Sequence, residues 1–347
     1  MPSLTAQYLD RLTFTASQTR TVRALGEHQG RQELFVRQTP EVLSTLRNAA
    51  VIESSESSNR LEGVTAPRDR IDLLVLHAAQ PVGRDEAEIA GYRDALQAIH
   101  ADALNLPFRE LTIRQLHDLL YRYLPARGGQ YKSSENSIVE RNPDGSTRLR
   151  FQPLGVTQTP PAMADLVNFT ELSLKRDQRE PLIVVPLTIL DFLCIHPFSD
   201  GNGRTARLLT LLLLYQTGHN VGRYISLERV IEQSRESYYD ALYRSSQGWH
   251  EDRHDPHPWL NYFWGMVLAA YKEFEDRVGT IKEGRGGKSE LVRAWVNSRV
   301  TSFRASEVAE ALPGISSDLI RSVLRQLRDE GVAEVIGQGR GARWRRK

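Results

Sequence analysis

The chain has 347 residues, of which 40% are hydrophobic and 25% charged, and its formal net charge is +2. These ordinary globular values exclude a disordered, collagen-like or strongly charged chain, and the length predicts a main domain with one or two smaller ones. The single cysteine, Cys194, excludes a disulfide framework and a cysteine-rich zinc site, and it favours a reducing cytoplasm.

Helical periodicity dominates the N-terminal third. Apolar residues recur near 3.6-residue spacing in 40–60, 85–100 and 111–124. The N-terminus has no apolar segment behind basic residues, so no signal peptide is expected. The apolar stretches Pro181–Ile195 and Leu208–Tyr215 are shorter than the roughly 18 residues of a membrane span, so they predict buried helices and no membrane contact.

A β-hairpin is predicted at Ser137–Gln152. Two short runs with β-branched and aromatic residues flank the turn sequence Pro143-Asp144-Gly145. Helical patterns resume near Ala162 and continue to about Phe274. The predicted fold class is therefore mainly α with one prominent hairpin.

The C-terminal part is predicted to be a separate small domain. Residues 275–289 have few large apolar side chains and several closely spaced glycines, which predicts a linker. Beyond it, helical patterns at Ala305–Leu312 and Ser316–Glu330 precede a strand at Val332–Ile336. This order predicts a winged-helix-like domain over 290–347, with a glycine-rich tip to its wing.

The most informative segment is HPFSDGNGRTAR, residues 196–207, which lies between the two apolar stretches. Gly201-Asn202-Gly203 can present successive backbone N–H groups to an anion, and a helix expected to start near Thr205 adds its positive N-terminal end. Arg204 and Arg207 lie three residues apart, so both are expected on one side of the first helical turn.

The same segment carries a base and a hard oxygen ligand. His196 can act as a general base near neutral pH, and the Asp200 carboxylate suits Mg²⁺, which usually bridges nucleotide phosphates. Each feature alone also occurs in ordinary turns, but their combination within twelve residues favours a nucleotide site. Neither a P-loop nor a kinase catalytic-loop pattern occurs, so those two folds are excluded.

The segment resembles the signature of the Fic family, HPFx(D/E)GNGRxxR, at every specified position. The family is α-helical, and its best-known activity is AMPylation, the transfer of AMP from ATP to a Ser, Thr or Tyr hydroxyl of a protein. The resemblance implies that His196 deprotonates the target hydroxyl and that Asp200 holds Mg²⁺, with Mn²⁺ as an alternative. It also implies nucleotide contacts from the following residues of the loop: Gly201, Asn202, Gly203, Arg204, Thr205 and Arg207. The related Doc kinases carry a lysine at the second glycine, so Gly203 favours adenylyl transfer.

A second family pattern lies upstream, in residues 58–63. The sequence SNRLEG resembles the inhibitory motif (S/T)xxxE(G/N), of which Ser58 and Glu62 are the defining residues. The resemblance implies that Glu62 pairs with Arg207 and prevents productive seating of the ATP γ-phosphate. The same pattern also fits a helix that ends at a glycine C-cap, which is the alternative interpretation.

Two further regions resemble parts of the family's site. The hairpin falls at the position of the family's flap, which implies that Ile138 and Val139 clamp the target side chain; a plain surface hairpin is the alternative. The sequence YYDAL, residues 238–242, resembles the adenosine-pocket helix, with Tyr239 as the candidate that lines the base. Surface packing is the alternative for Tyr239, and a position that is usually Asn in the family is Ser246 here.

Charge is unevenly distributed along the chain. Residues 288–347 hold 12 Lys and Arg against 7 Asp and Glu, whereas the preceding 287 residues hold 33 against 36. The basic C-terminal domain is therefore a candidate for DNA binding. Its second helix also carries Asp318, Asp329 and Glu330, which fit protein docking or dimerisation.

Together, the sequence predicts a Fic-type helical core with a β-hairpin flap and a small winged-helix-like domain. The predicted parts are an N-terminal region 1–105, a catalytic core 106–274, the linker 275–289 and the domain 290–347. The predicted function is a cytoplasmic protein adenylyltransferase that uses ATP, modifies proteins including itself, and is inhibited by Glu62. The alternatives are a DNA-binding regulator with a nucleotide-sensing core, and removal of AMP by the same site. A homodimer is one candidate oligomeric state.

Overall fold

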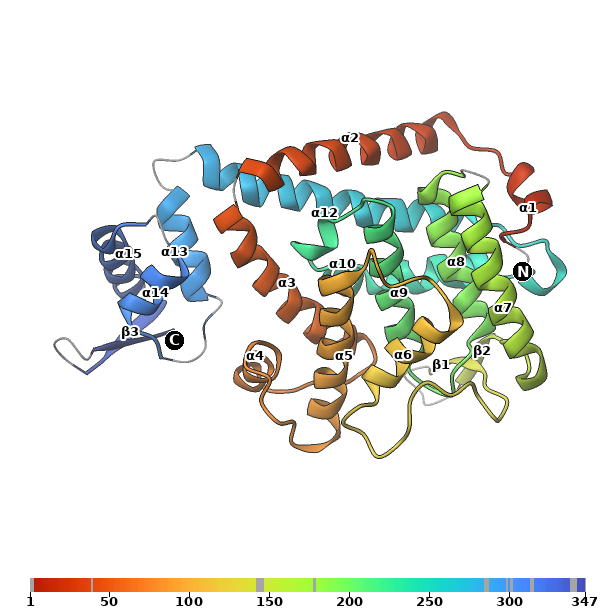
Figure 1. Cartoon of the computed structure of the whole chain (residues 1–347), viewed down its shortest axis with the longest axis horizontal. Helices are drawn as coiled ribbons and strands as arrows, with labels where there is room; N and C mark the ends of the chain where they lie inside the picture. The colour runs from red at the N-terminus through yellow and green to blue at the C-terminus, as the bar shows by residue number, and fades with distance from the viewer. Residues whose placement is uncertain are drawn as a thin grey trace.

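The fold is described from a computed structural model (Figure 1). It describes residues 3–38, 40–141, 147–176, 179–283, 287–297, 299, 302–312, 315–337 and 342–346. The helices before the hairpin are α1 (Ala6–Asp10), α2 (Ala16–Gln38), α3 (Pro40–Leu61), α4 (Arg68–Leu76), α5 (Gly83–Asp102) and α6 (Glu110–Leu120). The helices after it are α7 (Thr159–Glu171), α8 (Pro181–Ile195), α9 (Asn202–Gln216), α10 (Leu227–Gln233), α11 (Arg235–Ser246), α12 (His257–Glu283), α13 (Gly287–Asn297), α14 (Ala305–Ala311) and α15 (Ser317–Asp329). The strands are β1 (Ile138–Arg141), β2 (Thr147–Phe151), β3 (Ala333–Ile336) and β4 (Arg343–Arg346), and short helical turns are η1 (Val156–Gln158), η2 (Leu172–Arg176), η3 (Val221–Arg223) and η4 (Trp249–Glu251).

Helix α8 lies in the centre of the body because nearly every side of it is apolar. It packs against α7, α9 and α12, as the two apolar stretches predicted (Figure 1). Pro186 has no N–H for the carbonyl of Leu182, four residues earlier. Trp264 Nε1 donates to that carbonyl over 2.6 Å, and Trp259 Nε1 donates to the Pro186 carbonyl over 2.7 Å. Two indoles from α12 therefore satisfy the backbone of α8 and fix the two helices together.

Helices α2 and α3 cover one side of this body. Helix α2 lies along α12, and α3 packs on α5 and α10 (Figure 1). Ser54 of α3 donates to Glu228 Oε2 over 2.7 Å, and Tyr92 of α5 donates to Glu228 Oε1 over 2.8 Å. All three residues are buried, so this contact fixes α3 on both neighbours. It thereby positions the C-terminal end of α3 beside the start of α9.

Strands β1 and β2 form the predicted hairpin. They pair antiparallel, with Val139 opposite Leu149 and Glu140 opposite Arg148. The predicted turn Pro143-Asp144-Gly145 lies outside the described residues. Figure 1 places the hairpin at one end of α8 and α9, where the signature loop joins them.

The C-terminal helices α13–α15 and the antiparallel pair β3–β4 follow the order that the sequence predicted. Phe303 and Trp344 exchange two backbone hydrogen bonds of 2.8 and 2.7 Å, which join β4 to the segment between α13 and α14. The prediction of a linker over 275–289 is wrong for its first part, because α12 continues to Glu283 and buries Val278. Charged residues with good helix propensity sustain this extension despite its low apolar content. DNA binding by the C-terminal domain stays a prediction.

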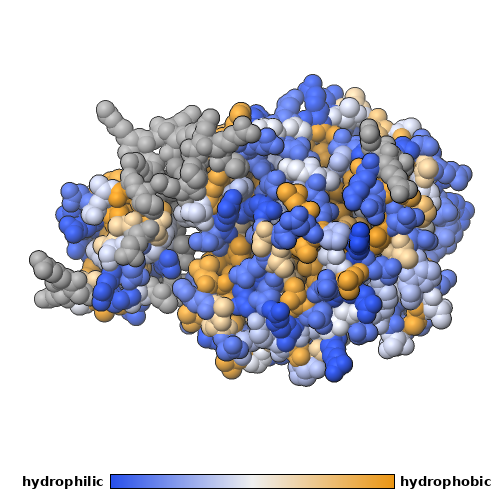
Figure 2. All heavy atoms as spheres, in the orientation of Figure 1, coloured by the Kyte–Doolittle hydropathy of each residue, from blue (hydrophilic) through white to orange (hydrophobic). Residues whose placement is uncertain are grey.

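The fold is mainly α, as predicted. Across the residues described above, no helix has both the length and the apolar character needed to cross a membrane. Figure 2 shows hydrophilic side chains over most of one face of the molecule, with smaller hydrophobic groups between them.

Candidate active site

The signature segment connects the end of α8 to the start of α9. His196 follows α8 in the left-handed conformation, with φ of 51°, and its N–H donates to the Phe192 carbonyl over 2.9 Å. A non-glycine residue rarely adopts this conformation, so the surrounding contacts must hold it. Helix α9 begins at Asn202, which corrects the predicted start near Thr205, and Gly201 precedes it with φ of 78°.

Side chains within the segment brace the loop against the core. Asn202 Oδ1 accepts from the Phe198 N–H over 2.9 Å, and Asn202 Nδ2 donates to the Phe198 carbonyl over 2.8 Å. The Phe198 ring is fully buried. Thr205 was predicted to contact nucleotide, but its buried hydroxyl donates to the Gly201 carbonyl over 2.9 Å. Thr205 therefore closes the first turn of α9 and does not line the cavity beside it.

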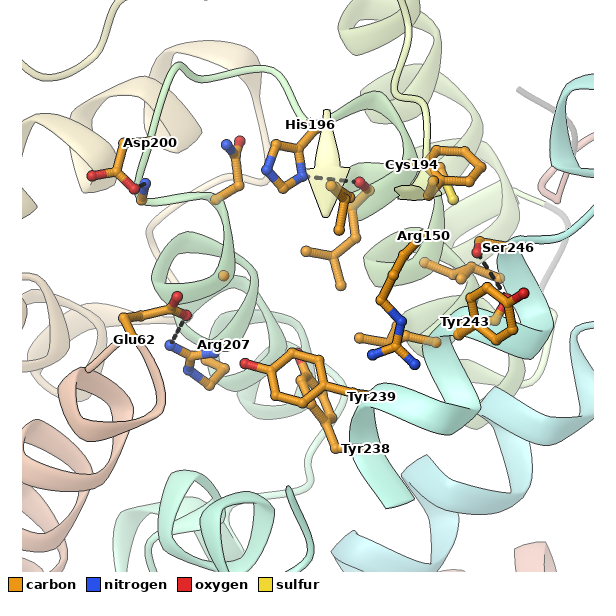
Figure 3. A pocket seen from close by; sticks show the side chains of 18 of the residues that line it. Glu62, Arg150, Cys194, His196, Asp200, Arg207, Tyr238, Tyr239, Tyr243 and Ser246 are labelled. Carbon is orange, nitrogen blue, oxygen red and sulfur yellow. Dashed lines mark hydrogen bonds and ion pairs between the residues drawn. The ribbon is translucent and has the colours of Figure 1, made fainter. Parts of the chain in front are cut away.

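A cavity of about 260 Å³ lies beside this loop, between the flap and the C-terminal end of α3 (Figure 3). Most of the predicted site residues line it, together with several that the sequence did not indicate. The lining includes Glu62, Ile138, Arg150, Phe151, Cys194, His196, Asp200, Gly201, Asn202, Gly203, Arg207, Tyr238, Tyr239, Tyr243 and Ser246. The structure thus brings Glu62, which follows α3, together with residues of β1, β2, α8, α9 and α11.

His196 has the protonation state that a general base needs. Its Nδ1 lies 3.2 Å from the Leu193 carbonyl, so Nδ1–H donates there and Nε2 keeps its lone pair. Burial lowers the pKa of His196 to about 4, and the positive charge of Lys132 adds to this shift. The hydrogen bond to the Leu193 carbonyl opposes the shift but does not outweigh burial. The imidazole is therefore neutral at pH 7 and can accept a proton.

For the AMP transfer that the sequence predicts, this lowered pKa sets the expected pH profile. Because the neutral imidazole is the active form, kcat/KM is expected to stay level from neutral pH downward and to fall only as the pH approaches 4. Rates measured in overlapping buffers from pH 4 to 8, with circular dichroism to confirm folding at each pH, check this result. An acidic limb centred near the ordinary histidine pKa of about 6.5 would contradict a buried, neutral His196.

Glu62 occupies the anion-binding end of α9. Its Oε1 accepts from Arg207 Nη2 over 2.8 Å, while Arg207 also donates from Nη2 to the Ser58 carbonyl and from Nε to Ser58 Oγ, each over 2.8 Å. A Cβ atom added at Gly203 would lie 2.4 Å from Glu62 Oε1, so the carboxylate rests directly against the glycine. A negatively charged side chain therefore fills the position that the loop offers to a phosphate.

Arg204 departs from its predicted place. It was expected beside Arg207, facing the nucleotide, but it is 3% exposed and does not line the cavity. Its Nη1 donates to Glu88 Oε2 over 2.5 Å and to Asn59 Oδ1 over 3.4 Å. The three-residue spacing separates two side chains by about 60° around a helix, and Glu88 of α5 fixes Arg204 on the inner side. Of the two arginines, only Arg207 faces the cavity.

Asp200 offers one carboxylate to a metal ion. Its Oδ1 accepts from the Gly201 N–H over 2.7 Å, and its side chain is 65% exposed. In the described part of the chain, no group of three or more His, Cys, Asp or Glu side chains is arranged to hold a metal. One exposed carboxylate fits Mg²⁺, which keeps several waters and takes further oxygens from substrate phosphates.

His117 is a site residue that the sequence did not reveal, because its apolar neighbours indicated core packing. Its Nδ1 accepts from the Gly129 N–H over 2.8 Å, so Nε2–H donates to the Asp200 carbonyl over 3.0 Å. Its ring stacks on Phe198, with 3.7 Å between centroids. His117 therefore fixes the backbone of the residue that would hold the metal.

For the predicted AMP transfer, His117→Ala is expected to lower the rate without removing any side chain that lines the cavity. Losing the partner of a metal-binding residue typically costs roughly 10–100-fold in metal affinity or activity. Transfer rates measured against Mg²⁺ concentration should show a raised requirement for the ion, which His117→Asn should partly restore. His77→Ala, at an exposed histidine after α4, is the control. An unchanged Mg²⁺ requirement in His117→Ala would count against this role.

Lys132 and Asn136 also hold the loop, and no sequence pattern indicated them. The buried Lys132 Nζ donates to Asn136 Oδ1 over 2.8 Å and to the Ile195 carbonyl over 3.2 Å. Asn136 Nδ2 in turn donates to the Phe198 carbonyl over 3.1 Å. The segment before the flap therefore shapes the loop that follows α8.

The flap contributes one of its two predicted residues to the cavity. Ile138 lines it, but Val139 is 53% exposed and does not, because neighbouring strand residues point to opposite faces. Arg150 of β2 was not predicted; it lines the cavity, and its guanidinium lies 5.1 Å from the Tyr243 ring centroid. Tyr239 lines the same end, as predicted.

Comparison with known proteins relates part of the chain to one family. Residues 107–214 match the Fic/DOC family. The "Protein adenylyltransferase Fic" of Nematostella vectensis is 25% identical over 202 residues, which cover 55% of this chain and 42% of that protein. The protein of the same name from Aedes aegypti is 28% identical over 168 residues, 46% of this chain and 30% of that protein. The chain thus spans less than half the length of these curated relatives.

Solved structures share the fold. A Fic family protein from Desulfovibrio desulfuricans has a TM-score of 0.61 at 23% identity, and the match covers 97% of each chain. Fic-1 from C. elegans has a TM-score of 0.60 at 18% identity, over 77% of this chain and 73% of that chain. The similarity to the Fic/DOC family is therefore carried by residues 107–214, which include the signature segment.

Proposed function

We propose that the chain is a protein adenylyltransferase that transfers AMP from ATP to a Ser, Thr or Tyr hydroxyl. The observation that supports it most is that a neutral histidine, the N-terminal end of a helix and a buried arginine face one cavity. The names of the curated relatives support the same activity. The proposal includes modification of the chain itself.

In the proposed reaction, the hydroxyl oxygen of the target attacks the α-phosphorus of ATP. His196 Nε2 takes the hydroxyl proton, the new O–P bond forms, and the bond to the β-phosphate oxygen breaks, so that pyrophosphate leaves. Backbone N–H groups at Gly201–Gly203 would stabilise charge on the phosphates. Arg207 would bind the terminal phosphate once Glu62 has moved away from it.

Asp200 would hold the Mg²⁺ ion that accompanies the nucleotide, or Mn²⁺ in its place. When bound, the ion neutralises charge on the phosphates. The exposed Asp200 carboxylate is oriented by the Gly201 N–H and by the His117 contact to its own carbonyl. These contacts support the assignment of Asp200 as a protein ligand of the ion.

The test compares two labels on ATP. The chain with Glu62→Gly is incubated with Mg²⁺ and ATP that is radiolabelled on the α-phosphate or on the γ-phosphate, and protein-bound label is measured. Adenylyl transfer predicts that only the α-label is retained. Retention of γ-label alone would identify a kinase, and retention of neither would reject both activities.

Removal of AMP is a second candidate reaction, which the position of Glu62 supports. Its carboxylate lies in the cavity and its side chain is 34% exposed, and a carboxylate can align a water molecule for attack. A modified chain that carries Glu62 should release AMP, and one with Glu62→Gly should not. Equal release of AMP by both proteins would reject a role for Glu62 in the removal of AMP.

A further inference from the structure

A second cleft lies away from the catalytic cavity and shares no lining residue with it. Its volume is about 430 Å³, within the range of small-molecule sites. It is formed by Gln32 and Glu33 of α2, Arg47 of α3, His100 of α5, and Asn220, Arg223 and Tyr224 around η3. Four segments that are distant in the sequence therefore converge on it.

Two guanidinium groups in this cleft are held by neutral groups. Arg223 donates from Nε to Asn220 Oδ1 over 3.1 Å and from Nη1 to the His100 carbonyl over 2.5 Å. Arg47 donates from Nη2 to Tyr224 Oη over 3.1 Å. Considering the described residues only, neither guanidinium forms an ion pair with a carboxylate, so no described carboxylate neutralises their charges.

Arg47, His100 and Arg223 line the same cleft, so both positive charges act on this histidine. Burial, and then the charges of Arg223 and Arg47, lower the pKa of His100 to about 3. The ring is therefore neutral at pH 7, with Nε2 3.1 Å from Tyr215 Oη. Glu33, at the exposed rim, is the acidic residue of the lining. The cleft thus carries a net positive charge.

Gln32 adds a polar atom that lacks a partner. Its side chain is 3% exposed, and Oε1 is buried without a hydrogen-bond donor among the described residues. Buried amide oxygens are normally satisfied, so an unsatisfied one in the wall of a cleft indicates a donor supplied by a bound molecule.

We propose that this cleft binds a small phosphate monoester that also carries a hydroxyl or amino donor. A phosphate monoester carries nearly two negative charges at pH 7, which matches two guanidinium groups. Its donor would satisfy Gln32 Oε1. The site is separate from the nucleotide site, and its existence does not depend on the transfer reaction.

The first test is isothermal titration calorimetry of inorganic phosphate into the full chain, with potassium chloride keeping the ionic strength constant. Arg47→Gln is expected to weaken binding roughly tenfold, because a charge-assisted contact is lost. Arg20→Gln, an exposed arginine of α2 outside the cleft, should change it less than about twofold. No binding by the wild type, or equal binding by Arg47→Gln, overturns the inference.

Phosphate that binds at the catalytic loop is distinguished by Arg207→Gln. The inference requires binding that survives in Arg207→Gln, and it is overturned if this change removes all binding. Tungstate soaked into wild-type crystals locates the anion independently if Arg207→Gln does not fold; tungstate at the catalytic loop alone would also overturn the inference. These measurements need no ATP or target, so they do not depend on adenylyl transfer.

The donor is tested with glycerol 3-phosphate, which adds two hydroxyl groups to the phosphate. It should bind the wild type more tightly than inorganic phosphate does, and Gln32→Leu should remove that difference while leaving phosphate binding intact. Equal affinity of the wild type for both probes would overturn the assignment of Gln32.

Discussion

Replacing His196 with alanine, in a chain that also carries Glu62→Gly, is expected to lower the rate of AMP transfer roughly 10²–10⁴-fold, the range for losing a general base. The reason is that the Nδ1 contact to Leu193 leaves Nε2 as the proton acceptor in the cavity. Single-turnover transfer of α-labelled ATP measures the effect.

The control for this change is His77→Ala, which removes an exposed histidine and should leave transfer unchanged. Calorimetry should show that His196→Ala still binds ATP, because Arg207 and the N-terminal end of α9, which would bind the phosphates, are unchanged. Transfer at the undiminished rate in His196→Ala would show that another group accepts the proton and would reject the proposed role.

Glu62→Gly alone is expected to raise automodification roughly 10- to 150-fold, since a hydrogen bond between charged groups contributes about 1.5–3 kcal/mol. The change removes the carboxylate that holds Arg207 and rests on Gly203. The initial rate of α-label incorporation is the measurement, with Glu62→Gln as a second variant that keeps the size of the side chain.

Glu56→Gln is the matched control for this activation. Glu56 also lies near the C-terminal end of α3, but it pairs with Arg60 and Arg68 outside the cavity. It should leave transfer at the wild-type rate. Activation by Glu56→Gln to the same extent as by Glu62→Gly would indicate that loosening α3 is sufficient, and the direct contact with Arg207 would not be the inhibitory element.

The sequence predicted the parts of the site that depend on local order. The segment from His196 to Arg207 is continuous, so its glycines and its base could be identified without knowing the rest of the fold, although α9 begins three residues earlier than predicted. Ile138 and Val139 are neighbours in a strand, and successive side chains of a strand point to opposite faces, so only one of the two can face inward. Applying that rule to the hairpin would have corrected the prediction for Val139.

Other contacts could not be predicted because they join distant segments. Arg204 turns inward to Glu88, which lies on α5 and precedes it by 116 residues. His117 and Lys132 reach the loop through backbone carbonyls, which leave no pattern in the sequence. The extension of α12 was missed because the burial of Val278 and the helix propensity of the charged residues together outweigh the low apolar content.

The position of Glu62 just beyond the last residue of α3 has a kinetic consequence. Ser58, within the helix, holds Arg207 independently, so the Glu62 carboxylate can leave by rotation of one partly exposed side chain while α3 stays docked. Rotamer changes of exposed side chains take roughly picoseconds to nanoseconds, which is much faster than the roughly 1–10³ turnovers per second of typical enzymes. Inhibition should therefore reduce the steady rate without producing a lag when ATP is added.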